Sequence, residues 1–130
     1  MDGRNILTMT TSQSDQDQDV APIDLEHCIK MFNGQRDVVL ELVGDLLRLF
    51  DEQKKTIKVA LADNDPEKLR RESHSIKGGA AVLSAGPLLE AAKVLEEIGR
   101  SGDLSGGEEA FSRLEEEAAR LAACWTSLKR

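Results

Sequence analysis

Apolar residues recur at helical spacing in four long segments of the chain. The clearest pattern is in the last segment, where the apolar positions are separated by 3-4-3-4-3 residues: Phe111, Leu114, Ala118, Leu121, Trp125 and Leu128. Similar patterns run from Val39 to Ile57, from Leu69 to Leu83 and from Leu88 to Ile98. Each pattern places its apolar side chains on one face of a helix, so the sequence predicts four amphipathic helices that bury these faces together.

Turn-forming and capping residues separate these segments. Asp63-Asn64-Asp65-Pro66 predicts a helix end followed by a new helix, with Asp65 as its cap and Pro66 at its first position. Ser84 to Pro87 marks the next break, and Gly99 to Gly102 closes the following helix. Ser105-Gly106-Gly107-Glu108 matches a capping box before the last one. Short breaks between four helices predict an all-α, antiparallel up-and-down four-helix bundle.

A shorter helix is expected before the bundle. It begins near Pro22-Ile23-Asp24, where Asp24 can cap it, and it extends to Phe32 before Asn33-Gly34 ends it. The second helix follows over residues 35–62. Residues 1–21 are rich in Ser, Thr, Gln and Asp and contain few large apolar side chains. We therefore expect a disordered tail over 1–21 and a folded domain over 22–130, with the short helix as an additional N-terminal cover.

His74 points away from the apolar face of its helix. Leu69, Ser73, Ile76, Ala80 and Leu83 fall within about 40° of one line along the helix, whereas His74 lies about 140° away. A lone helical histidine is usually an ordinary surface residue, but the flanking residues favour a functional role. Lys77 and Arg70 place cations on the same outer face. An exposed neutral imidazole beside cations suits phosphorylation on nitrogen.

Two small residues on this outer face, Gly78 and Ala81, lie one and two turns after His74. A glycine inside a helix costs about 0.5–1 kcal/mol relative to alanine, so the pair Gly78-Gly79 requires a compensating role. The pair can permit close helix packing or mark a helix end. The solvent-side position of Gly78 favours a different role, a gap through which a partner's active site reaches the imidazole.

Composition narrows the classes of function. The 130 residues and 40% apolar content fit one domain, and the 3% aromatic content favours helices over sheets. A net charge of -7 argues against nucleic acid as the main ligand. No apolar run approaches the length of a membrane span or a signal peptide, so we expect a cytoplasmic protein without a membrane partner.

Metal and acid–base sites are poorly supported. Cys28 and Cys124 are far apart, and His27-Cys28 lacks the further ligands of a zinc site, so we expect no bound metal. Two glutamate runs, 108–109 and 115–117, are expected on the solvated face of the last helix.

The run His74-Ser75-Ile76-Lys77-Gly78-Gly79-Ala80, followed by Leu83, Leu88 and Leu95-Glu96, resembles the signature of histidine-containing phosphotransfer (HPt) domains. The resemblance extends over most of residues 35–128. It implies that His74 accepts and donates a phosphoryl group, that Lys77 is the cation beside it, and that Gly78 provides clearance. Ser84 stands where many members have glycine, a departure that affects a helix-end contact and leaves the chemistry intact.

The resemblance implies a phosphorelay intermediate rather than an enzyme. Its partners would be the receiver domain of a response regulator and a hybrid or other histidine kinase. The chain would need no cofactor of its own, because magnesium is expected on the partner receiver domain. We expect it to act as a monomer. The residues expected at the edge of the docking surface are Leu47, Arg70, Arg71, Lys77 and Ala81.

Two alternatives remain open at this point. A helical adaptor could bind a partner through Leu40 and Leu47 without any phosphate transfer, because both leucines lie off the main apolar line of their helix. The chain could also be the phosphotransfer domain of a chemotaxis-type kinase. Because no kinase region follows the last helix in this sequence, we expect this alternative only if the chain is a fragment.

Overall fold

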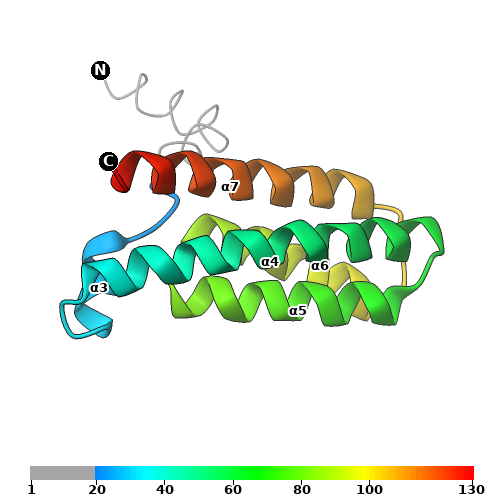
Figure 1. The fold of residues 1–130 in the computed structure, drawn as a ribbon. Helices are drawn as coiled ribbons and strands as arrows, with labels where there is room; N and C mark the ends of the chain where they lie inside the picture. The colour runs from blue at the N-terminus through cyan, green and yellow to red at the C-terminus, as the bar shows by residue number, and fades with distance from the viewer. Residues whose placement is uncertain (1–19) are drawn as a thin grey trace, which may run out of the picture.

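The computed structural model describes residues 20–130, and this part of the chain is entirely helical apart from turns. The helices are α3 (Leu25–Met31), α4 (Arg36–Ala62), α5 (Pro66–Val82), α6 (Gly86–Ser101) and α7 (Gly107–Leu128). The four long helices lie side by side with alternating direction, and α3 lies at one end, beside the start of α4 (Figure 1). The predicted all-α bundle with a short extra helix is confirmed. The expected tail lies outside the described residues except for positions 20 and 21.

Each long helix packs against its neighbours in the chain, and α4 also packs against α7, which closes the bundle. The most extensive packing joins α5 to α6. Gly99 explains how close these two helices come, since a Cβ atom there would lie 2.7 Å from the backbone nitrogen of Arg70. This close approach brings the α6 side chains one turn before Gly99 within reach of the middle of α5.

The helix starts largely follow the predicted capping chemistry. Asp24 and Asp65 each accept a hydrogen bond of 3.1 Å, from the backbone N–H of His27 and of Lys68 respectively, and Pro66 occupies the first turn of α5. The predicted capping box at Ser105 is wrong. Helix α7 begins after Gly106, which has no side chain to act as a cap, and the backbone N–H of Ser105 donates its hydrogen bond to the Asp103 carboxylate within the loop.

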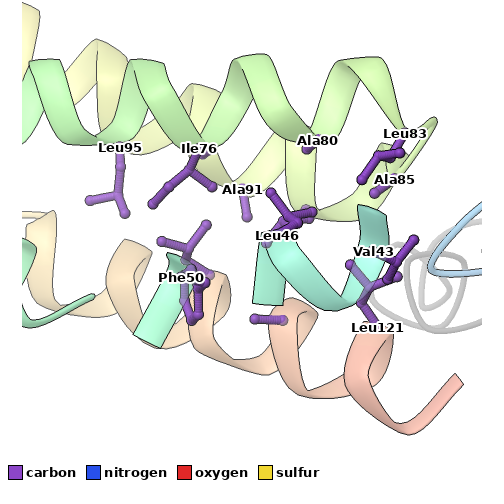
Figure 2. Packing of buried hydrophobic residues seen from close by; sticks show 14 of the residues in the cluster. Val43, Leu46, Phe50, Ile76, Ala80, Leu83, Ala85, Ala91, Leu95 and Leu121 are labelled. Atoms are coloured by element: carbon purple, nitrogen blue, oxygen red, sulfur yellow. The ribbon is translucent and has the colours of Figure 1, made fainter. Parts of the chain in front are cut away.

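The predicted apolar faces form one core between the helices. Figure 2 shows side chains of α4 meeting those of α5, α6 and α7, among them Val43, Leu46, Phe50, Ile76, Ala80, Leu95 and Leu121. Leu40 is also buried, with 8% of its surface exposed, which removes one of the two leucines that supported the adaptor alternative. The last predicted core positions of α7, Trp125 and Leu128, are only partly buried.

Glu117 departs from the prediction that residues 115–117 face solvent. It is 4% exposed, and its carboxylate pairs with Arg113 at 2.9 Å and with Arg120 at 2.7 Å. These arginines lie one turn before and one turn after it on α7, so they neutralise the carboxylate from both sides. A buried carboxylate is tolerated where it is paired in this way.

Within residues 20–130, none of the helices combines the length and the apolar content that a bilayer crossing requires.

Candidate functional site

His74 lies in the middle of α5 with 62% of its side chain exposed, as the periodicity predicted. Its neighbours Ser73 and Ile76 are buried on the opposite side of the helix. The imidazole is therefore mounted on the outer wall of a packed bundle, and the rigid helix fixes its position.

Glu96 is the main partner of the imidazole, and it comes from α6. Its carboxyl oxygen Oε2 lies 2.7 Å from His74 Nδ1, although the glutamate itself is only 1% exposed. Glu96 is part of the family-like sequence pattern, but no role is predicted for it from the sequence. A signal was present, because Glu96 lies four residues after Ala92 and three before Gly99, inside the buried face of α6.

Lys77 and Arg100 complete a cluster around this carboxylate. Lys77 Nζ lies 2.6 Å from Glu96 Oε1, and Arg100 Nη2 lies 3.3 Å from Oε2. The pKa of Glu96 falls from 4.5 to about 2. The hydrogen bond from Lys77 lowers this pKa most, burial raises it, and the hydrogen bond with His74 also lowers it. Glu96 is consequently ionised at neutral pH.

An ionised Glu96 determines which ring nitrogen of His74 is free. A carboxylate only accepts hydrogen bonds, so the short contact requires the proton of a neutral imidazole to be on Nδ1. The lone pair is then on Nε2, the nitrogen that the carboxylate does not hold. The cluster thus presents an imidazole whose ring is oriented by a buried anion and whose Nε2 is the nucleophilic nitrogen of the neutral form.

The two glycines after His74 have different roles. A Cβ atom at Gly78 would meet nothing within 4 Å, so this glycine leaves open space on the surface beside the imidazole. A Cβ atom at Gly79 would lie 2.8 Å from the Leu46 side chain, so that glycine permits close packing of α5 against α4. The close-packing interpretation therefore applies to Gly79, whereas the role of Gly78 as a gap for a partner stays a prediction. Ala81 is exposed on the same outer face.

The arginines expected near His74 are on α5 as predicted, but one of them already has a partner. Arg70 binds Glu67 through two hydrogen bonds, of 3.1 Å from Nε and 2.7 Å from Nη2. Arg71 is exposed. Leu47 is not part of this group, because it lines a groove between α4 and α7 together with Trp125 and Phe50.

Two further apolar side chains, which the sequence did not single out, are exposed on α5 and α4. Val82 is 63% exposed and lies one turn after Gly78, and Leu49 is 52% exposed on α4. Gln53 Nε2 donates a 2.9 Å hydrogen bond to Ser75 Oγ, which sets the register of α4 against α5. Because the two helices are antiparallel, Leu49, one turn before Gln53, lies alongside the residues that follow Ser75. Periodicity places Val82 on the outer face of α5, but it does not separate Leu49 from the buried leucines of α4.

Comparisons with known proteins identify one family and one similar solved structure. A family model described as the Hpt domain matches residues 41–124, which contain His74, Lys77 and Glu96. No curated protein matches the chain. Among solved structures, the crystal structure of histidine-containing phosphotransfer protein B (HptB) from Pseudomonas aeruginosa PAO1 is similar, with 26% sequence identity and a TM-score of 0.70. The match covers 84% of this chain and 94% of that chain.

Proposed function

The chain belongs to the Hpt domain family and is a histidine phosphotransfer protein of phosphorelay signalling, and on this premise we propose that His74 is the residue that carries the phosphoryl group. The observation that supports this assignment is the pairing of His74 with Glu96, which leaves Nε2 as an exposed nucleophile. The other histidine of the chain, His27, lies on α3 and is exposed, but it has no such partner carboxylate among its described contacts.

Transfer from an aspartyl phosphate needs no base on this chain. The Nε2 lone pair attacks phosphorus, an N–P bond forms, and the P–O bond to the aspartate breaks, with the electron pair returning to that carboxylate. Nδ1 already holds its proton, so none has to leave, and the imidazole becomes a cation. Glu96 lies 2.7 Å from Nδ1 and stabilises this cation. The reverse sequence returns the phosphoryl group to an aspartate.

Most of the catalysis would come from the partner. Phosphoryl transfer depends on in-line positioning and on neutralising charge around the phosphoryl oxygens. His74 supplies the nucleophile and Lys77 supplies a nearby cation, while the magnesium ion and the acidic residues that bind it would belong to the receiver domain. The chain is a carrier in this scheme and relies on the active site of its partner.

The partners would be the receiver domain of a response regulator and a histidine kinase, both in the cytoplasm, with the chain acting as a monomer. Gly78 and Ala81 leave space around His74 for an approaching active site, and Leu49 and Val82 add exposed apolar area beside it. Arg71 lies at the edge of the same surface. Leu47 is not included, because it faces α7.

The test is phosphate labelling by a phosphorylated receiver domain. We expect label on the wild type and on His27→Gln, which alters the other histidine, and no label on His74→Gln. The label should be lost in acid and kept in base, as is characteristic of an N–P bond. Equal labelling of His74→Gln and the wild type would overturn the assignment.

A further inference from the structure

Lys77 is already engaged in an ion pair with Glu96. Its ammonium nitrogen is 2.6 Å from Glu96 Oε1, and its side chain is only 30% exposed. The ammonium has three N–H donors, but while it contacts Oε1 its charge is shared with Glu96, so Lys77 acts fully on the phosphoryl group at His74 only when it leaves Oε1. The role proposed for Lys77 therefore requires a change of partner.

That change would leave a buried anion with fewer partners. Glu96 is 1% exposed, and removing one partner of a buried ion pair is strongly unfavourable because the remaining charge lacks solvation. His74 becomes a cation during transfer, but it is bound at the other oxygen, Oε2, so Oε1 would be left without a partner. A second cation within reach of Glu96 is needed.

Arg100 has the position and the geometry for this role. It lies one turn after Glu96 on α6, with Nη2 3.3 Å from Oε2, while its Nη1 bonds to the exposed Glu97 at 2.7 Å. The contact with Glu96 is long and the side chain is 52% exposed, so the guanidinium has room to move. Its fork of N–H groups can bind both oxygens of one carboxylate.

The other charged group near this carboxylate is less suitable. Arg70 on α5 interacts electrostatically with Glu96, but it donates two hydrogen bonds to Glu67, and no hydrogen bond joins it to Glu96. In residues 20–130, the ion pairs of Glu96 are with His74, Lys77 and Arg100. Arg100 is therefore the cation that can take the place of Lys77.

We propose that Arg100 is a positioning residue for Lys77. Arg100 moves onto Glu96 Oε1 when Lys77 leaves it, and this exchange releases Lys77 to the phosphoryl group. The proposal rests on the proposed function of His74. Arg100 itself need not contact the phosphoryl group. Without Arg100, Lys77 stays paired with the buried Glu96 carboxylate and does not move to the phosphoryl group.

The experiment measures the rate of transfer from a phosphorylated receiver domain to the full chain. Arg100→Ala should slow transfer about threefold to tenfold, and Arg100→Lys should restore most of the rate because a cation is again available. Arg48→Ala is the matched control. It removes an exposed arginine from an i, i+3 ion pair with Asp45, on the side of α4 that faces α7. Its rate should equal that of the wild type.

A double-mutant cycle separates this role from a general structural effect. If Arg100 acts through Lys77, then Arg100→Ala should have no further effect once Lys77→Ala is present. Equal rates for Arg100→Ala and the wild type, or full additivity of the two substitutions, would overturn the proposal. Either result could occur while His74→Gln still abolishes labelling, so the proposal can fail without the assignment of His74 failing. Circular dichroism of each variant tests whether the variant is folded.

Discussion

At the scale of single residues, the site depends on one buried carboxylate. Glu96 orients the imidazole, sets its tautomer and holds Lys77, although only 1% of its surface reaches solvent. An isolated carboxylate would not remain ionised at such a position. The cations around it supply the stabilisation, and one of them, Lys77, is also the cation of the proposed transfer reaction.

Replacing this carboxylate by an amide should change how stability depends on pH. The pKa of Glu96 is about 2 in the folded protein, against an ordinary value of 4.5, so the folded state favours the ionised form. Its contribution to the free energy of unfolding is fully present above pH 4.5 and is lost as the pH falls toward 2. Urea unfolding across this range should show the advantage of the wild type over Glu96→Gln shrinking as the solution becomes more acidic. A constant difference would contradict the assigned role.

At the scale of helices, the site depends on how α5 sits against α6 and α4. Gly99 allows the backbones of α5 and α6 to approach closely, and the Gln53–Ser75 hydrogen bond sets the register of α4 against α5. The closeness of α5 and α6 is what allows a carboxylate on one helix to meet an imidazole on the other.

Two glycine-to-alanine substitutions should have opposite effects on stability. Gly99→Ala places a Cβ 2.7 Å from the Arg70 backbone nitrogen and should destabilise the fold by about 1–3 kcal/mol, since backbone cannot easily move aside. Gly78→Ala meets open space and should stabilise α5 by about 0.5–1 kcal/mol. Thermal or urea unfolding measures both. Destabilisation by Gly78→Ala would show that this glycine has a packing role.

Sequence pattern was sufficient for several features that depend on one helix alone, although it failed for the cap of α7 and for the burial of Glu117. The exposure of His74, the caps at Asp24 and Asp65, and the buried faces all follow from local spacing, and the structure confirms them. The pairing of Glu96 with His74 depends on the register between two helices, which periodicity does not set. The same limit applies to Leu47 and Leu49, which lie two residues apart in α4 but on sides facing different neighbours.

At the scale of the whole molecule, the bundle has distinct outer faces, and His74 lies on only one of them. Val82, with 63% exposure, lies on α5 near His74, whereas Val94, with 52% exposure, lines a groove between α6 and α7. These two valines have the same side chain and similar exposure. They therefore provide a matched pair for locating the docking surface.

We expect Val82→Asp to lower the rate of phosphoryl transfer from a receiver domain and Val94→Asp to leave it unchanged. A carboxylate at position 82 would lose its hydration if a partner covered it, and leaving it unpaired in an interface is costly. A carboxylate at position 94 would remain in water if the partner binds the His74 face alone. Transfer rates measured over a range of receiver concentrations separate weaker docking from slower chemistry. Similar losses for both variants would show that the partner contacts more than the face around His74.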